Sequence, residues 1–349
     1  MKGILTITLL LAATAAGAQI NLSSNENPWG VTKQVEESII SELPNVNRYA
    51  AKYGADFVRK VAAHEGVDED QIIIGESLEL WGIYQAVKGG PGSEFIYSVP
   101  GYPAMVNAAA SVGGKVVAVP LNDRKENDLK SIEAKVNGKT QALFIVNPHN
   151  PTGTVSDKQV FHDFLHRVSK KALVIVDEAY LEFSDDFDGR TALKNLKAGD
   201  NVVVFRTLAK AYGLAGLYIG YAIAPKEVAA YMKDKGLGDT HALNRLSVAA
   251  AAAALADKEN LTRTTQIIAS ERFKWNAWLD NLHIEHTASQ ANFIFINTGH
   301  PFPVIHQRLL NAGIHTGNLV PAYPNWIRIT IGTPEENQAV RNVIGSLTE

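Results

Sequence analysis

Short apolar runs recur between residues 70 and 210, and stretches with helical periodicity separate them. The runs ALFIV, ALVIV and VVVF are apolar throughout instead of alternating with polar residues, which is typical of strands covered on both faces. Between the first two of these runs, SDKQVFHDFLHRVSKK carries its apolar residues at helical spacing. The pattern predicts an α/β protein with a mainly parallel, doubly wound sheet.

Between residues 225 and 282 the strand pattern stops, and two long helices are predicted. The strands NFIFIN and WIRITI follow, interleaved with helices at about 302–312 and 334–347. Thr333 and Glu336 are spaced as a capping box at the start of the last helix, with a proline at its first position. This part of the chain is therefore predicted to form a smaller α+β domain.

The N-terminal sequence has the features of an export signal. Lys2 precedes an uncharged apolar stretch, and Ala-Gly-Ala at positions 16–18 is a suitable cleavage site before Gln19. The apolar stretch is too short for a permanent membrane anchor. We therefore expect a signal peptide at residues 1–18 and a periplasmic or secreted mature protein; the alternative is a buried N-terminal helix of a cytoplasmic protein.

The composition narrows the functional classes. The chain has 349 residues, of which 46% are hydrophobic, so it can bury a sizeable core. Its 33 basic and 36 acidic residues are interspersed and give a net charge of −3, which argues against a nucleic-acid partner. Because the sequence contains no cysteine, disulfides, thiolate nucleophiles and cysteine-ligated metals are excluded.

Three of the predicted strands run directly into distinctive polar residues. ALFIV leads to Asn150, ALVIV leads to Asp177 and Tyr180, and VVVF leads to Lys210. In open parallel sheets, ligands bind beyond the carboxyl ends of the strands, so these side chains are expected to face one crevice. An amide, a carboxylate and a lysine at a dry sheet edge suit a ligand with a phenolic oxygen, a protonated aromatic nitrogen and an aldehyde.

The motifs NPHNPTGT, VIVDEAYLEF and FRTLAKAYGLAGLYIGY, in this order, resemble those of the fold type I pyridoxal-phosphate enzymes, the class I/II aminotransferases. LSSNENPWG, RYAAKYGADFVRKVAA and IRITIGTPEEN are most similar to the histidinol-phosphate aminotransferase branch. The resemblance covers nearly all of the chain after the signal peptide. It implies that an amino group moves between an amino acid, or an amine like histidinol phosphate, and a 2-oxo acid.

The resemblance also implies the cofactor, the domains and the assembly. The cofactor is expected to be pyridoxal 5′-phosphate, and the protein is expected to be a homodimer that binds small-molecule substrates. The predicted domains are an N-terminal arm that contributes to the small domain (19–45), a large cofactor-binding domain (46–240) and a C-terminal small domain (241–349).

Lys210, Asp177 and Tyr180 are the expected catalytic residues. A poorly solvated lysine without an acidic partner has a lowered pKa, so its amine can react with an aldehyde and move protons. By the resemblance, Lys210 holds the cofactor, Asp177 faces its pyridine nitrogen, and Tyr180 and Asn150 reach its phenolic oxygen. The alternatives are a lysine that extends from a helix start into solvent and an aspartate that merely caps a helix.

The same resemblance assigns the other cofactor contacts. Tyr102 is expected to stack on the ring, unless it only packs a loop against the core. The phosphate is expected at the start of the helix after IIIG, near Ser77 and Leu78, with the hydroxyl of Thr207 nearby. Tyr49 is expected to reach the phosphate from the neighbouring subunit.

Two positions depart from the family pattern at the phosphate. Relatives usually have serine before the lysine and arginine eight residues after it, where this chain has Ala209 and Tyr218. A tyrosine donates one neutral hydrogen bond, whereas an arginine donates charge-assisted and often bidentate ones. Weaker cofactor binding is therefore expected, unless a nearby group such as Arg206 compensates.

Arg328 is the expected substrate residue. It alternates with isoleucines in WIRITI, so it points away from the core, and by the resemblance it binds the anionic end of the substrate. The alternative is a solvated arginine. Asn25 is expected to line the entrance. Gly317 stands where relatives carry a second arginine, which argues against a phosphorylated substrate and for an ordinary amino acid, aromatic or apolar.

The sequence also allows other functions. His162 and His166 lie four residues apart, but no third ligand is identifiable, so polar histidines on a helix face are favoured over a metal site. The same cofactor also serves decarboxylases, lyases and racemases. A degenerate homologue that binds ligand without turnover is a third hypothesis, against which the three retained catalytic positions argue.

Overall fold

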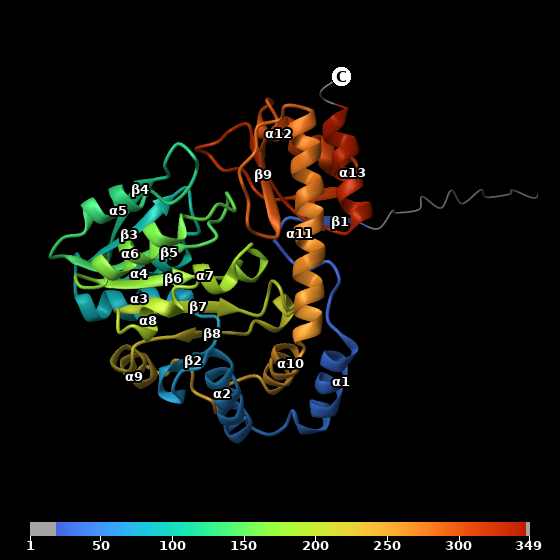
Figure 1. Cartoon of the computed structure of the whole chain (residues 1–349). Helices are drawn as coiled ribbons and strands as arrows, with labels where there is room; N and C mark the ends of the chain where they lie inside the picture. Colours follow the sequence, from blue (N-terminus) through green and yellow to red (C-terminus); the bar gives the residue numbers. More distant parts are fainter. Residues whose placement is uncertain (1–18, 347–349) are drawn as a thin grey trace, which may run out of the picture.

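The computed structural model of the protein describes residues 19–346, so the expected signal peptide lies outside the described residues (Figure 1). The largest element is a seven-stranded sheet with the order β2-β8-β7-β6-β5-β3-β4. All strands run in the same direction except β8, which is antiparallel to both of its neighbours. The strands are β2 (Ile72–Ile74), β3 (Glu94–Val99), β4 (Lys115–Pro120), β5 (Thr140–Val146), β6 (Leu173–Asp177), β7 (Val202–Thr207) and β8 (Gly220–Ile223).

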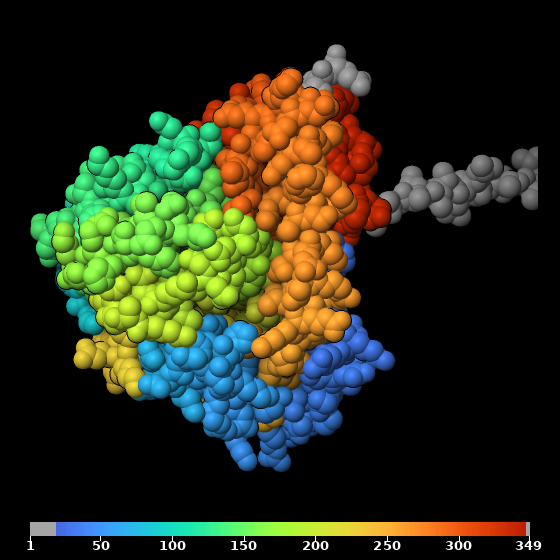
Figure 2. Space-filling view, viewed as in Figure 1, coloured from blue at the N-terminus to red at the C-terminus, as the bar shows by residue number. Residues whose placement is uncertain are grey.

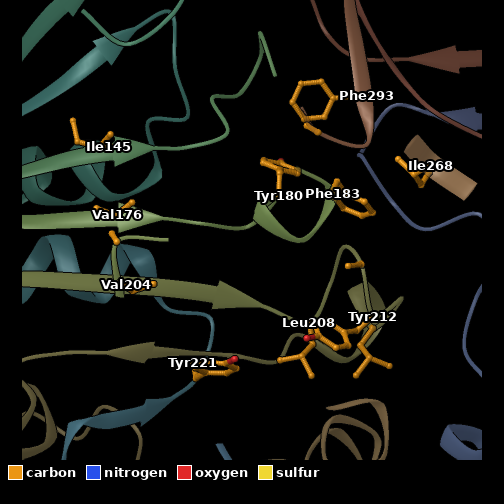
Figure 3. Close-up of a cluster of buried hydrophobic side chains, with 14 of the residues drawn as sticks. Ile145, Val176, Tyr180, Phe183, Val204, Leu208, Tyr212, Tyr221, Ile268 and Phe293 are labelled. Atoms are coloured by element: carbon orange, nitrogen blue, oxygen red, sulfur yellow. The ribbon is translucent and has the colours of Figure 1, made fainter. Parts of the chain in front are cut away.

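Apolar side chains on both faces of the sheet are buried, as the uniformly apolar strands predict. In β5, Leu143 and Ile145 belong to one apolar cluster, whereas Phe144 and Val146 belong to the other. Figure 3 shows Ile145, Val176 and Val204 on three successive strands. This alternation follows from the two-residue repeat of a strand and confirms the doubly wound sheet.

Helices supply the apolar side chains opposite each face. Residues from the following helices belong to the first cluster: α2 (Ala51–Glu65), α5 (Leu129–Lys135), α6 (Lys158–Val168) and α8 (Leu193–Lys197). The second cluster receives residues from α3 (Leu78–Gly89), α4 (Ala104–Ser111) and α9 (Lys226–Asp234). The short α7 (Phe187–Arg190) precedes α8.

The C-terminal part combines two small sheets with long helices. β9 (Phe293–Asn297) pairs antiparallel with β11 (Trp326–Thr330), and β1 (Ile20–Leu22) pairs parallel with β10 (Ile314–Thr316). The helices are α10 (Arg245–Ala256), α11 (Lys258–Asn281), α12 (Phe302–Asn311) and α13 (Pro334–Gly345). The capping box predicted for α13 is confirmed, because Thr333 and Glu336 exchange hydrogen bonds.

Helix α11 connects two regions of the molecule. It begins beside α10 and runs along the outside of the protein to α12 and α13 (Figure 1), and its side chains form part of the surface in Figure 2. α10 contacts both α1 (Lys33–Glu42) and α2, so segments from the predicted arm, large domain and small domain meet there. The exact domain boundaries stay a prediction.

Within residues 19–346, no helix has the length and apolar character needed to span a bilayer.

Candidate active site

The carboxyl ends of β5, β6 and β7 open onto one cavity of about 470 Å³. Most of the residues predicted to contact cofactor or substrate line it, namely Asn25, Leu78, Tyr102, Asn150, Asp177, Tyr180, Thr207, Lys210, Tyr218 and Arg328. Ser77 and Tyr49 are not among the residues that line it. The convergence of three strand ends on one site is therefore confirmed.

Asp177 is a buried carboxylate at the end of β6. It is 6% exposed, and the backbone N–H of Ala179 donates a hydrogen bond of 3.0 Å to its Oδ1. Burial raises the pKa of Asp177 to about 6, although that hydrogen bond and the charge of Lys210 act in the opposite direction. In the described part of the chain, no cationic side chain forms an ion pair with it. A cationic group of a ligand would stabilise the ionised form of this buried carboxylate.

Lys210 follows β7 and reaches the N-terminal segment. Its Nζ donates a hydrogen bond of 2.9 Å to the backbone carbonyl of Ser24. Burial lowers the pKa of the Lys210 amine, the charge of Glu76 opposes this shift, and the charge of Arg328 adds to it. Within residues 19–346 Lys210 forms no ion pair, but the nearby carboxylates moderate the shift that the sequence predicts for an isolated amine.

Tyr180 is held by two amides. Its hydroxyl accepts hydrogen bonds from Nδ2 of Asn25 at 3.1 Å and from Nδ2 of Asn150 at 3.2 Å. Its ring meets that of Phe293 edge to face, with centroids 5.1 Å apart, and Figure 3 shows the two side chains beside each other. These contacts fix the orientation of the phenol at the cavity wall.

The position of Asn25 corrects one expectation. Asn25 lines the cavity but is only 1% exposed, so it forms part of the buried wall instead of the entrance. Its backbone has φ +55°, in the left-handed region that asparagine tolerates better than most residues. Its N–H donates to Oγ1 of Thr330 at 2.9 Å, and Nδ2 of Asn292 donates to its carbonyl at 2.9 Å.

Arg328 projects from β11 into the same cavity. Nη1 donates to Oδ1 of Asn150 at 2.7 Å, and Nη2 donates to the carbonyl of Ser23 at 2.6 Å. Its guanidinium carbon lies 5.6 Å from the centre of the Phe293 ring. Burial lowers its pKa, and in the described residues no carboxylate forms an ion pair with it. The cavity therefore contains a desolvated cation that lacks an anion.

The region near the start of α3 differs most from the expectation. Ser77 is the residue before the helix and its side chain makes no capping hydrogen bond. Glu76, which the sequence analysis missed, lines the cavity, and the hydroxyl of Thr207 donates a hydrogen bond to its carboxylate. Glu79 lines the cavity as well. A glutamate after a strand gives no distinctive sequence pattern, so only the fold reveals these acidic groups.

The suggestion that Arg206 compensates for the missing arginine is wrong. Arg206 is 4% exposed, and its guanidinium lies 3.0 Å from the carboxylate of Glu178 and 3.5 Å from that of Glu65. Nη2 also donates to the hydroxyl of Thr191 at 2.9 Å. These buried partners come from distant parts of the sequence and neutralise the guanidinium. Arg206 lines the cavity and its Nε has no hydrogen-bond partner in the described residues, but it brings no uncompensated positive charge for a phosphate group.

The two tyrosines that were expected to contact the phosphate are both exposed. Tyr218 lines the cavity with its side chain 66% exposed and with a φ of +47°. Tyr49 is 77% exposed and stacks on His241, with ring centroids 4.0 Å apart, so it lies away from the cavity of its own subunit. Tyr49 is therefore not among the residues that contact a ligand in this cavity from the same subunit.

The two histidines on α6 are used in hydrogen bonds. Nδ1 of His162 lies 2.6 Å from Oδ1 of Asn195, and its Nε2 lies 2.9 Å from the carbonyl of Gly189. Nδ1 of His166 lies 2.8 Å from Oδ1 of Asp200. These contacts tie α6 to the segment around α8.

The cavity fits pyridoxal phosphate at its ring end. Asp177 offers a buried negative charge for a pyridinium, Tyr180 and Asn150 offer polar groups for the phenolic oxygen, and Lys210 offers an amine of lowered pKa. Tyr102 lines the cavity and is 41% exposed, so its ring is accessible to a ligand. At the other end, carboxylates stand where a phosphate is expected.

The comparisons with known proteins agree with this geometry. Residues 18–344 match the family described as Aminotransferase class I and II. Histidinol-phosphate aminotransferase 2 of Carboxydothermus hydrogenoformans is 33% identical over 332 residues, which cover 94% of this chain and 91% of that protein. Histidinol-phosphate aminotransferase of Staphylococcus saprophyticus is 35% identical over 330 residues, covering 94% and 91%.

A solved structure gives the same answer for the fold. The crystal structure of histidinol-phosphate aminotransferase from Sinorhizobium meliloti in complex with pyridoxal-5′-phosphate has a TM-score of 0.85 and 27% identity. The match covers 95% of this chain and 90% of that one. The predicted fold type is confirmed. The chain belongs to the class I and II aminotransferase family, and it is a pyridoxal-phosphate-dependent aminotransferase.

Proposed function

We propose that the residues at the ring end divide the chemistry of transamination among them. When bound, pyridoxal phosphate provides an electron sink for the electrons left when the α-proton of the substrate is removed. Asp177 keeps the pyridine nitrogen protonated, because a buried carboxylate gains most from a cationic neighbour. Lys210 accepts the α-proton and returns it, because its lowered pKa makes the neutral amine available.

Neighbouring polar groups orient the cofactor in this proposal. Tyr180 and Asn150 would contact its phenolic oxygen, and the hydrogen bond from Asn25 keeps the Tyr180 hydroxyl in place. Tyr102, which lines the cavity with an accessible ring, would stack on the cofactor ring. The phosphate would bind at the start of α3, where Leu78 and Thr207 line the cavity and Ser77 is the residue before the helix.

The substrate proposed here is an amino acid whose carboxylate binds Arg328. The observation that carries this proposal is the desolvated guanidinium that lacks an anion, in the same cavity as Lys210. A carboxylate accepts paired hydrogen bonds from a guanidinium and neutralises its charge. Lys210 lines the same cavity, and the charge of Arg328 acts on its amine.

The side chain of the substrate is proposed to be apolar or aromatic and unphosphorylated. A Cβ at Gly317 would lie 3.1 Å from Nε of Arg328, so the position of a second arginine is adjacent to the first but is occupied by glycine. A neighbouring groove of about 320 Å³ shares Tyr102, Asn150 and Arg328 with the cavity, and its other residues include Leu319, Val320 and Pro321. Such a surface favours apolar side chains over a phosphate ester.

Substrate competition tests this proposal. We expect kcat/KM for phenylalanine, tyrosine or leucine, with 2-oxoglutarate as acceptor, to exceed kcat/KM for histidinol phosphate by at least about tenfold. Histidinol phosphate is the second candidate, because the relatives described above carry its name. A preference for histidinol phosphate over the whole amino-acid panel would overturn the proposal and leave transamination intact.

We also propose that the protein is a homodimer. Tyr49 is exposed and does not line the cavity of its own subunit, which is expected of a residue that completes the site of a partner. Sedimentation equilibrium measures the assembly directly. Mixing Tyr49→Phe with Lys210→Ala protein should give hybrid dimers. In each hybrid, one site combines Lys210 of the first subunit with the wild-type Tyr49 of the second. A purely monomeric protein with full activity would contradict the proposal.

Export to the periplasm or the medium is proposed from residues 1–18 alone. The charged start, the apolar stretch and the Ala-Gly-Ala site support it. N-terminal sequencing of the protein from cell fractions should give a chain that begins at Gln19 outside the cytoplasm. An intact Met1 on cytoplasmic protein would exclude it.

A further inference from the structure

Two carboxylates line the cavity at the end where the phosphate of the cofactor is expected. Glu76 lies between the end of β2 and the first residue of α3, and Glu79 lies in the first turn of that helix. The Glu76 side chain is held in place, because Thr207 donates a hydrogen bond to its carboxylate and a Cβ at Gly220 would lie 2.9 Å from its Cγ. The acidic group at position 76 is thus part of the built wall of the site.

Charged and titratable groups face Glu76 from several elements. Lys210 and Asp177 act on it from the ends of β7 and β6. Burial raises the pKa of Glu76 to about 7, the charge of Lys210 opposes this rise, and the charge of Asp177 adds to it. Tyr218 faces it from the segment before β8, and Glu79 adds a second carboxylate to the same wall.

A phosphate group at this place meets an electrostatic conflict. Above pH 7 a phosphate monoester carries nearly two negative charges. The start of α3 favours an anion, whereas an ionised Glu76 repels it and already accepts the hydrogen bond of the Thr207 hydroxyl. The family's arginine is replaced by Tyr218, and the guanidinium of Arg206 is paired with Glu178 and Glu65. No cation in the described residues offsets the carboxylate at this end except Lys210, which the cofactor itself engages.

We propose that the phosphate of pyridoxal phosphate binds this chain together with one proton, which Glu76 takes up and then donates as a hydrogen bond to a phosphate oxygen. A neutral carboxylic acid is a donor where the ionised form is only an acceptor. Cofactor loading therefore weakens as the pH rises above the range in which Glu76 ionises. This inference concerns the cofactor alone and is independent of which amino acid is the substrate.

The test uses two ligands that differ only in the phosphate. 4′-Deoxypyridoxine 5′-phosphate and 4′-deoxypyridoxine lack the aldehyde, so neither reacts with Lys210. Their dissociation constants for the full-length apoprotein are measured between pH 6.5 and 9 by calorimetry. The ratio of the two constants isolates the phosphate, because the titrations of the ring, Asp177 and Lys210 affect both ligands.

The preference for the phosphorylated ligand is the dissociation constant of 4′-deoxypyridoxine divided by that of its 5′-phosphate. In the wild-type protein this ratio should fall by about tenfold per pH unit above pH 7.5, as uptake of one proton requires. In Glu76→Gln the preference should stay constant within about twofold over the same range and should exceed the wild-type preference at pH 9. Glu79→Gln is the matched control, because it removes the other carboxylate of the wall, and it should keep the wild-type slope.

A second measurement does not need any variant. Titrating wild-type apoprotein with the phosphorylated ligand at pH 8, in buffers of different ionisation enthalpy, counts the protons taken up. We expect nearly one proton more than with the unphosphorylated ligand. Equal proton uptake for the two ligands, or the same slope in Glu76→Gln as in the wild type, would overturn the proposal.

Discussion

Oδ1 of Asn150 accepts a hydrogen bond of 2.7 Å from Nη1 of Arg328. Nδ2 of the same amide donates to the hydroxyl of Tyr180 at 3.2 Å. A single side chain therefore joins the proposed carboxylate-binding residue to the phenol that faces the cofactor. It also fixes the direction of the amide, since only one orientation satisfies a donor on one side and an acceptor on the other.

Asn150→Ala should impair both ends of the site. The guanidinium loses one charge-assisted hydrogen bond and Tyr180 loses one donor, so kcat/KM should fall by about tenfold to a hundredfold. Steady-state kinetics with a good amino donor measures this. Asn311→Ala, at an exposed position, is the control and should leave kcat/KM unchanged. Wild-type kinetics in Asn150→Ala would show that the amide has no functional role.

Arg328→Gln should raise the KM for an amino acid because it removes the cation that the carboxylate needs. The loss of a paired charged interaction predicts a fall in kcat/KM of about a hundredfold or more. The amine that has the same side chain as the amino acid but lacks the carboxylate reacts slowly, and its kcat/KM should change by less than about threefold. If both substrates lost activity equally, Arg328 would act on the fold of the site instead of on the carboxylate.

Gly317→Ala should disturb Arg328 without unfolding the protein. The added Cβ would lie 3.0 Å from the carbonyl oxygen of Arg328 and 3.3 Å from its Cβ, so the side chain has to shift by a few tenths of an ångström. We expect KM to rise about threefold to tenfold with little change in Tm. Gly138→Ala is the control, because a Cβ there meets no atom within 4 Å. An unchanged KM would argue against close coupling of the two positions.

Asp177 should make the apoprotein less stable as the pH rises. Burial raises its pKa from the ordinary value of 3.8 to about 6 in the folded state. Between these values the folded state binds more protons than the unfolded state, so the free energy of unfolding falls as the pH rises through 6. In urea denaturation without cofactor, the free energy of unfolding of Asp177→Asn should rise by up to about 3 kcal/mol relative to that of the wild type between pH 4 and pH 7. Asp188→Asn, at an exposed position, should show no such gain.

The sequence predicts the site well where the groups follow strands of one sheet. Asn150, Asp177 and Lys210 come after β5, β6 and β7, and the common direction of these strands is enough to bring the three side chains to one edge. Arg328 also follows from local alternation in β11. For these residues, the strand that the sequence pattern predicts also sets where the side chain lies in the folded protein.

Groups whose roles depend on distant partners were not predictable. The ion pairs of Arg206 join residues from α2 and from the loop after β6, and nothing near Arg206 in the sequence marks them. Asn25 reaches the buried wall because β1 pairs with β10 across nearly the whole chain. Glu76 looks like an ordinary residue before a helix, and only the hydrogen bond from Thr207 places its carboxyl group in the cavity wall.

The single-turnover reaction of the purified holoenzyme with one amino acid tests the central claim most directly. Without an acceptor, the visible absorbance of the bound cofactor should convert fully to that of its amine form, one oxo acid should appear per site, and adding a 2-oxo acid should restore the original spectrum. Lys210→Ala should bind cofactor but convert at least about a thousandfold more slowly. Absence of conversion with every amino donor, or full conversion in Lys210→Ala, would contradict the account.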